Sequence, residues 1–143
     1  MPAPPAAHAQ EVDDLADLDP DACRALLGAG GRGRVVFTEH ALPAVVPRPY
    51  VLWGDRLWFP VPAWTALAGH RDGGVLAFHV DHVDACARAG WSVTVLGPAR
   101  TEPPRAAPAA ARALAADAGG AGLLSLDAVR FTGRVLGRLR RAA

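Results

Sequence analysis

The sequence predicts a mainly β protein, a small antiparallel barrel with peripheral helices. Apolar and polar residues alternate along residues 91–100, which is typical of a half-buried strand. A Gly-Asp pair at residues 54–55 joins two apolar segments, as in a tight β-hairpin. The predicted order is one helix, several strands that follow one another directly, a second helix and a last strand. This order favours an antiparallel barrel over a parallel βαβ sheet.

Length and composition limit the class of protein. A chain of 143 residues is typical of one domain, and we expect a disordered tail at residues 1–10 and a single domain at residues 11–141. The formal net charge of +1 gives no general attraction for nucleic acid or an anionic membrane. No apolar run reaches the roughly 18 residues of a membrane span, and we find no secretory signal at the start. The two cysteines, Cys23 and Cys86, make no disulfide framework and predict a soluble cytoplasmic protein. The absence of lysine excludes a P-loop lysine and a Schiff-base lysine.

The first half of the chain predicts one capped helix and three strands. Asp19 suits an N-cap and Pro20 the first helical position, and the glycines of residues 28–33 end the helix. Pro47 and Pro49 cannot donate a backbone hydrogen bond, so the strand that holds them should lie at a sheet edge or a bulge. The predicted strands are 34–38, 44–53 and 56–59, with a hairpin connection at 39–42.

The second half predicts three more strands around an alanine-rich segment. Residues 64–69 can form one short helix, and residues 104–117 form a helix or a partly ordered linker. The predicted strands are 75–83, 91–100 and a sixth, closing strand at 125–139.

Two short motifs are weak signals of function. Residues 28–33 carry the letters G-x-G-x-x-G, but they follow a helix and open a strand, which is the reverse of a dinucleotide fingerprint. In a strand, His79 and Asp81 would share one face, and His82 and Asp84 the other. A metal site needs three or four convergent ligands, so we predict no metal and interpret this segment as a strand that runs into a polar turn.

The aromatic residues are more informative. Trp53 and Trp58 flank the predicted turn, and we expect them to pair across the hairpin. Trp91 begins a strand, where it can line a cavity wall. Core packing is the more frequent role of any one of these side chains, but together they suit a planar aromatic ligand.

Several segments carry a family resemblance. Residues 33–37, 42–43, 47–50 and 54–59 read GRVVF, LP, PRPY and GDRLWF, and residues 75–81, 90–99 and 129–134 read VLAFHVD, GWSVTVLGPA and VRFTGR. In this order and spacing, they resemble the flavin-binding split barrel of the pyridoxamine 5'-phosphate oxidase-like family. The segment 90–99 is the most specific match.

The resemblance implies a fold, a partner and a cofactor. In that family two split barrels pair, and a flavin mononucleotide (FMN) lies at each end of the dimer interface. The resemblance therefore implies a split-barrel homodimer that acts as a flavin-dependent oxidoreductase on a small molecule. Some relatives bind an 8-hydroxy-5-deazaflavin or haem instead. We expect the apolar strand face of Trp91, Val93 and Val95 to need a partner at the dimer interface.

The cofactor-binding segments depart from the family pattern. The Asn of the family's P-V-N-Y segment is Pro49 here, and only Thr65 keeps a hydroxyl in the phosphate-binding segment. The phosphate-binding Arg, Thr and Lys of the family correspond here to Pro60, Val61 and Ala66. A hydrogen bond to a charged group contributes about 1.5–3 kcal/mol, so the loss of two charged contacts removes about 3–6 kcal/mol. Arg48 or Arg71 can recover part of this by turning toward the phosphate.

The resemblance makes six residues candidates for flavin binding and identifies no catalytic residue. They are Arg48 and Tyr50 beside the ring or ribityl chain, Thr65 at the phosphate, Trp91 and Ser92 at the interface, and Phe59. Two alternatives stay open. The replaced phosphate residues favour a non-enzymatic split-barrel homodimer that has lost flavin binding. A haem binder would use His79 or His82.

Overall fold

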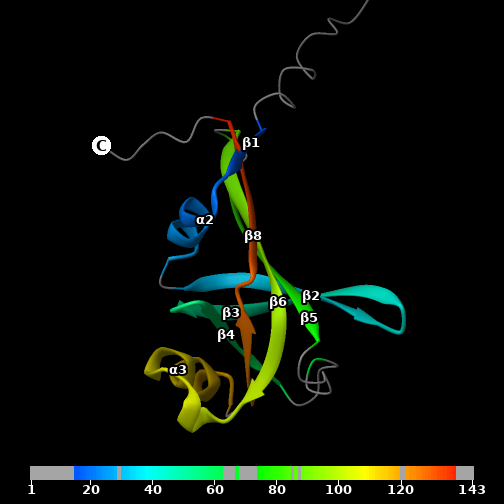
Figure 1. Cartoon of the computed structure of the whole chain (residues 1–143), viewed down its shortest axis with the longest axis vertical. Coiled ribbons are helices and arrows are strands. Elements are labelled where there is room, and N and C mark those ends of the chain that lie inside the picture. Colours follow the sequence, from blue (N-terminus) through cyan, green and yellow to red (C-terminus); the bar gives the residue numbers. More distant parts are fainter. Residues whose placement is uncertain are drawn as a thin grey trace, which may run out of the picture.

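A ring of antiparallel strands organises the protein (Figure 1). The computed structural model describes residues 15–28, 30–62, 67, 74–84, 86, 88–119 and 122–137. Its elements are β1 (Leu15–Leu18), α2 (Pro20–Leu27), β2 (Gly31–Glu39), β3 (Leu42–Trp53), β4 (Arg56–Val61), β5 (Val75–Asp84), β6 (Ala89–Glu102), the 3-10 turn η2 (Pro104–Ala106), α3 (Ala109–Asp117), β7 (Gly122–Asp127) and β8 (Arg130–Leu136). The predicted tail at residues 1–10 lies outside the described residues, and so does the predicted short helix at 64–69 apart from Leu67.

The strands close into a barrel that continues into an open sheet. Their order is β1-β8-β6-β5-β2-β3-β4-β7, and β7 also pairs with β6, which closes the ring. Strands β8 and β1 continue the sheet from the other edge of β6. All of these pairs are antiparallel, so the predicted mainly β split barrel with peripheral helices is confirmed.

Strand β6 belongs to both parts of this sheet. Its residues 90–96 pair with β8, and its residues 99–102 pair with β7. Gly97 lies between the two stretches, where a Cβ atom would overlap the carbonyl oxygen of Asp127. The absence of a side chain at Gly97 therefore lets β6 pass from one part of the sheet to the other.

The last predicted strand is interrupted, because β7 ends at Asp127 and β8 begins at Arg130. The prediction of one closing strand at 125–139 is therefore wrong. The backbone N–H of Ala128 donates to Asp55 O at 2.9 Å, and that of Val129 donates to Leu96 O at 3.1 Å. These bonds to other parts of the chain redirect the backbone between two strands. The two residues between the strands, Ala128 and Val129, are apolar and not turn formers, so the sequence pattern gave no signal of the interruption.

Helix α2 begins and ends as predicted. Asp19 Oδ1 accepts a hydrogen bond from the backbone N–H of Ala22 at 2.7 Å, and the helix stops before Gly28, whose φ is 58°. Cys23 packs directly on Gly133 of β8, where a Cβ atom would overlap its sulfur. Helix α2 therefore covers the core side of β8 and β6.

The described residues form two hydrophobic clusters that stabilise the fold. The main core fills the ring and includes Val35, Phe59, Phe78, Val93, Val95 and Leu126. A second cluster lies between α3 and the sheet and consists of Val51, Trp58, Ala107, Ala111, Ala115 and Leu123. Val93 and Val95 are fully buried in the main core. The expectation that their face needs a partner subunit is therefore wrong, because the barrel closes over it.

The β2–β3 hairpin projects from the barrel (Figure 1). Residues 42–50 of β3 pair with β2, but only residues 51–53 pair with β4. The half of β3 that holds Pro47 and Pro49 therefore has one described partner strand, which confirms the predicted edge.

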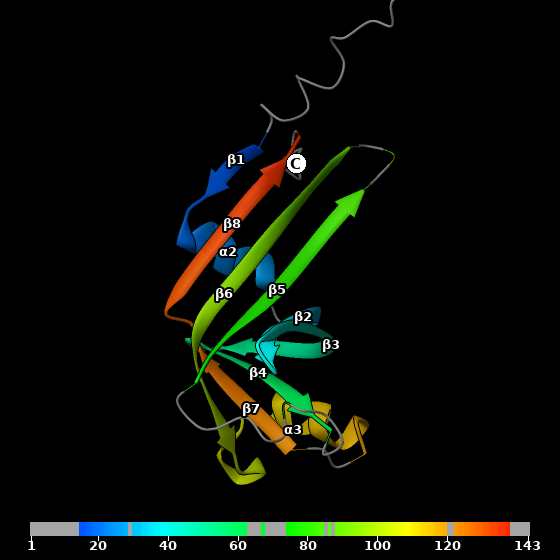
Figure 2. The same ribbon diagram turned by 90° about the vertical axis from the view of Figure 1, so that its right-hand side faces the viewer.

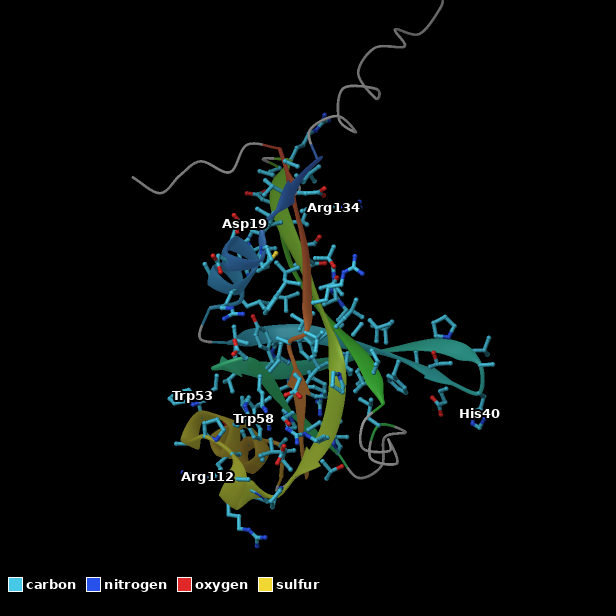
Figure 3. The ribbon with its side chains drawn as sticks, viewed as in Figure 1. Asp19, His40, Trp53, Trp58, Arg112 and Arg134 are labelled. Atoms are coloured by element: carbon cyan, nitrogen blue, oxygen red, sulfur yellow. The ribbon has the colours of Figure 1, made fainter. Side chains whose placement is uncertain are left out.

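Trp53 and Trp58 lie on one face of the next hairpin without facing each other directly. The register pairs Trp53 with Arg56, and Trp58 with Val51. The expected direct pairing is therefore wrong, because the two-residue turn opposes position 53 with position 56. Trp58 is buried beside α3, whereas Trp53 is 63% exposed (Figure 3).

Candidate functional site

Three of the six candidate residues come together where β3 and β4 meet the core. Tyr50 and Phe59 are both buried, and each ring centroid lies 5.2 Å from that of Phe78. The Tyr50 hydroxyl donates to Leu27 O at 2.8 Å, which ties β3 to the end of α2. Burial raises the pKa of Tyr50 above its usual value. Both aromatic side chains are therefore part of the hydrophobic core, and their contact with a flavin stays a prediction.

Arg48 is the polar member of this group. Its Nε donates to Pro47 O at 2.7 Å, and its Nη1 lies 3.4 Å from Pro60 O. The second contact is long and therefore weak. A guanidinium has five N–H donors, so these two bonds leave three for another acceptor. The side chain is half-buried, so those donors can be reached.

The phosphate-binding segment is described only in part. Thr65 and Arg71, which the sequence offered for phosphate contact, lie outside the described residues. Pro60 and Val61 close β4 with buried side chains that carry no polar atom. Among the described residues of this segment, a phosphate would therefore depend on backbone groups and on Arg48.

Trp91 and Ser92 lie on β6, away from this group and on opposite faces of the strand. Trp91 is on the core side, with its ring centroid 5.3 Å from that of His82. Ser92 is on the other side, opposite Asp81 on β5 and Arg134 on β8. Within one chain, the structure does not bring these two residues together with Arg48.

A hydrogen-bonded network lies on the same face as Ser92. His79 Nε2 lies 3.2 Å from Asp81 Oδ2, and His79 Nδ1 lies 3.0 Å from Thr94 Oγ1. Arg34 Nη1 is 3.3 Å from the same Asp81 oxygen. A carboxylate can only accept, so Nε2–H donates to Asp81, and in the neutral ring Nδ1 accepts from the Thr94 hydroxyl.

Sequence reasoning found half of this network. It predicted that His79 and Asp81 share a face, which is confirmed. It missed Arg34 and Thr94, because they reach His79 and Asp81 only through the register of β2 and β6 with β5. The alternation along each strand was the available signal, but it does not say which strands are neighbours.

The two histidines of β5 differ in their surroundings. Both ring nitrogens of His79 already have partners, and His82 is exposed. In the described part of the chain, no three His, Cys, Asp or Glu side chains are grouped so that they could hold a metal ion. The described helices include none that is long and apolar enough to cross a membrane.

Comparison with known proteins finds a matching family model and a relative in sequence. A family model described as pyridoxamine 5'-phosphate oxidase matches residues 19–133. An uncharacterized protein of Mycobacterium tuberculosis is 34% identical over 96 residues, which are 64% of this chain and 63% of that protein. The chain thus matches less than two thirds of that relative's length.

Solved structures share the fold at low sequence identity. An FAD-binding protein from Mesorhizobium loti superposes with a TM-score of 0.73 at 18% identity, over 86% of this chain and 99% of that one. An FAD-binding protein from Mycobacterium smegmatis gives 0.66 at 24% identity, over 85% and 98%. An FAD- and haem-binding protein from the same organism gives 0.67 at 14% identity, over 91% and 77%.

Proposed function

Because the chain belongs to the pyridoxamine 5'-phosphate oxidase family, we propose that it binds a flavin as a homodimer and oxidises or reduces a small molecule. The flavin would supply the hydride-transfer chemistry, and the protein would supply binding, orientation and electrostatics. Three solved structures with this fold are described as FAD-binding proteins, which supports a flavin in general.

The observation that carries the proposal is the position of Arg48. The family pattern has its phosphate-binding arginine at position 60, where this chain has proline. In the structure, the guanidinium of Arg48 reaches to within 3.4 Å of the carbonyl oxygen of Pro60. A cation from β3 thus lies beside the backbone position from which relatives supply one.

The donors of Arg48 fit a phosphate. Guanidinium groups bind phosphate through parallel, charge-assisted N–H bonds, and three N–H groups of Arg48 are not used by the two bonds described. FMN and FAD both carry phosphate, so Arg48 would serve either flavin. We assign Arg48 as the phosphate anchor of this chain.

Arg48 also has a purely structural interpretation. Pro49 has no backbone N–H to offer to β4, and β3 and β4 pair only over residues 51–53 and 56–58. The guanidinium would then serve only to satisfy the Pro60 carbonyl. The two interpretations differ in one respect, because a structural role does not depend on whether the ligand carries a phosphate.

The test compares FMN with riboflavin, which lacks the phosphate. Quenching of flavin fluorescence gives the affinity of the unmodified protein and of Arg48→Gln for both ligands. The loss of a charged hydrogen bond should weaken FMN binding by about 10- to 100-fold, while riboflavin binding changes by less than about twofold. Arg105→Gln, at an exposed arginine of η2, should leave both affinities unchanged.

Two other outcomes would change the interpretation of Arg48 or of the flavin site. An equal loss for FMN and riboflavin would show that Arg48 is structural. If neither flavin binds the unmodified protein, the flavin proposal is wrong.

A flavin-free homodimer is the second candidate function. The buried, nonpolar side chains of Pro60 and Val61 favour it, because they give a phosphate nothing to bind. This candidate predicts no saturable quenching of any flavin.

A further inference from the structure

A chain of hydrogen bonds crosses three strands on the outer side of the sheet. Phe78 and Val80 are buried in the core, so their neighbours His79 and Asp81 point outward. The register of β5 with β6 places Thr94 directly opposite His79. Figure 2 shows β5, β6 and β8 side by side from this outer side, with α2 behind β8 and β6. The proposed function as stated so far gives this network no role.

The network ends in a hydroxyl group. Arg34 Nη1 and His79 Nε2 lie 3.3 and 3.2 Å from Asp81 Oδ2, and His79 Nδ1 lies 3.0 Å from Thr94 Oγ1. The order is therefore guanidinium, carboxylate, imidazole, hydroxyl. Each ring nitrogen of His79 has a partner, so the ring is oriented from both sides. Thr94 is half-buried, and its hydroxyl makes no second side-chain hydrogen bond among the described residues.

The network has two states that differ by one proton. In the neutral ring, Nδ1 accepts from the Thr94 hydroxyl, so the Thr94 proton points inward to His79. In the charged ring, both nitrogens carry protons, so Nδ1–H donates to Thr94 Oγ1 and the Thr94 proton is free to point outward. Asp81 accepts from Nε2–H in both states. Protonation of His79 therefore makes Thr94 a donor toward a molecule on this face.

The Thr94 hydroxyl lies near a predicted flavin contact. Ser92 precedes Thr94 by two positions on the same face of β6, and it pairs with Asp81 of the network. Two such positions are about 7 Å apart along a strand. A substrate that reacts on a flavin held against Ser92 would therefore lie within reach of Thr94.

We propose that Thr94 donates a proton to the substrate of the flavin reaction and that His79 resupplies it, with Asp81 and Arg34 as positioning residues. This inference rests on the proposed function and deepens it, because it names the substrate class. The substrate would be a carbonyl acceptor of the quinone type, which takes up one hydride and one proton. A bound flavin, once reduced, supplies the hydride. The network supplies the proton.

One proton moves along the network in each turnover. As the substrate oxygen gains negative charge, it takes the proton of the Thr94 hydroxyl, and Thr94 Oγ1 takes the proton of His79 Nδ1. His79 becomes neutral, and water returns a proton to the ring, because this side chain is 29% exposed. The quinone, having gained one hydride and one proton, leaves as a hydroquinone. A reductant of the reduced nicotinamide class restores the two electrons.

The network also has a purely structural interpretation, because polar groups are normal on the solvent side of an antiparallel sheet. In that case the four side chains only satisfy one another, and the loss of the Thr94 hydroxyl would affect every electron acceptor alike. The two interpretations differ in whether the acceptor needs a proton.

The test compares two acceptors of the same FMN-loaded protein after anaerobic photoreduction. Menadione, a naphthoquinone, needs a proton, whereas ferricyanide takes only an electron. Stopped-flow absorbance follows the reoxidation. Thr94→Val should slow the menadione reaction at least about 100-fold, the lower end of acid catalysis, and change the ferricyanide rate by less than about twofold. Thr132→Val, at the residue that pairs with Thr94 from β8, is the matched control and should change neither rate.

The pH dependence separates a proton relay from a structural role. His79 must be charged for Thr94 to donate outward, so the menadione rate should fall more steeply than the ferricyanide rate as the pH rises. His79→Gln should remove this difference, and Thr94→Ser, which keeps the hydroxyl, should retain most of the menadione rate. The charged groups around the ring are Arg34 on β2, Asp81 on β5 and Arg134 on β8, and all of these variants keep them.

A measurement without flavin tests the network itself. In isotope-labelled, flavin-free protein, NMR should find the proton of the neutral His79 ring on Nε2, as the hydrogen bonds require. A proton on Nδ1 would overturn the inference, because both charge states would then leave the Thr94 hydroxyl in the same orientation.

Two kinetic results would also overturn the inference. They are an equal slowing of both acceptors by Thr94→Val and an unchanged menadione rate in that variant. Either result would leave the flavin proposal intact, because quenching of flavin fluorescence shows separately whether each variant binds FMN. Failure of the unmodified protein to bind FMN would instead contradict the proposed function, and this inference with it.

Discussion

Gly97 passes so close to Asp127 that a Cβ atom at position 97 would overlap the Asp127 carbonyl oxygen. The contact lies where β6 leaves β8 and joins β7, so it joins the barrel to the extended sheet. The atoms that a Cβ at position 97 would meet all belong to the backbone, so no flexible side chain can move to relieve the overlap.

We expect Gly97→Ala to be strongly destabilising. The methyl group must push two strands apart, and overpacking of this kind costs about 3 kcal/mol of unfolding free energy, or prevents folding. Gly122→Ala is the control, because the nearest atom to its Cβ is Val61 O at an ordinary 3.8 Å. Urea unfolding of both variants measures the difference. Equal unfolding free energies of the two variants would mean that Gly97 lies further from the Asp127 carbonyl than it does in the structure.

The second cluster contains a buried polar atom without a partner. Trp58 Nε1 has no hydrogen-bond partner among the described residues. An unsatisfied buried donor costs about 1–3 kcal/mol. Trp58→Phe removes that unsatisfied donor, which is stabilising, but it also makes a core side chain smaller, which is destabilising. Because the two effects oppose each other, we expect the unfolding free energy to change by less than about 1 kcal/mol. Trp58→Ala should cost about 3–5 kcal/mol.

Chemical denaturation distinguishes the two interpretations of Trp58. A loss of about 3 kcal/mol in Trp58→Phe would mean that the indole N–H does have a partner, such as an ordered water. Trp53→Phe, at the exposed tryptophan of the same hairpin, should change stability by less than about 0.5 kcal/mol.

The two thiols should differ in reactivity. Cys23 is buried, and burial raises its pKa from 9.0, with the nearby Asp19 carboxylate adding to the shift. Cys86 is exposed. We expect iodoacetamide to alkylate Cys86 quickly in the native protein and Cys23 only after unfolding, because the thiolate is the reactive form. Equal rates would mean that α2 opens readily from β8.

The same shift predicts a dependence on alkaline pH. Because the pKa of Cys23 is higher in the folded state, its contribution to stability is complete below the unfolded pKa of about 9.0 and is lost as the pH rises through the folded value. The unfolding free energy should therefore fall more steeply above pH 9.0 in the unmodified protein than in Cys23→Ala.

Much of the fold could be predicted, because local rules agree with the tertiary structure. The Asp19 cap and the Gly54 turn act through neighbours in sequence, and alternation identified β5 and β6. The break at Ala128 and Val129 could not be predicted, because it is made by hydrogen bonds to distant backbone. Strand β1 was missed for a similar reason, since its pairing with β8 overrides its acidic surroundings.

The candidate site was less accessible to sequence reasoning. The face shared by His79 and Asp81 follows from the period of a strand, but the contacts of Arg34 and Thr94 with them require the strand order. The approach of Arg48 to Pro60 likewise depends on the separation of β3 from β4 in the part of β3 that precedes residue 51. Such lateral contacts are set by three-dimensional register and leave no pattern along one segment.

We propose that this chain holds a flavin through its phosphate by means of Arg48. The most direct measurement is a titration of the unmodified protein with FMN, FAD and riboflavin, followed by quenching of flavin fluorescence. We predict saturable binding of the phosphorylated flavins, approaching one per chain, with riboflavin at least about tenfold weaker because it lacks the charge-assisted contact. Equal affinity for riboflavin and FMN, or no saturable binding of any flavin, would contradict the account.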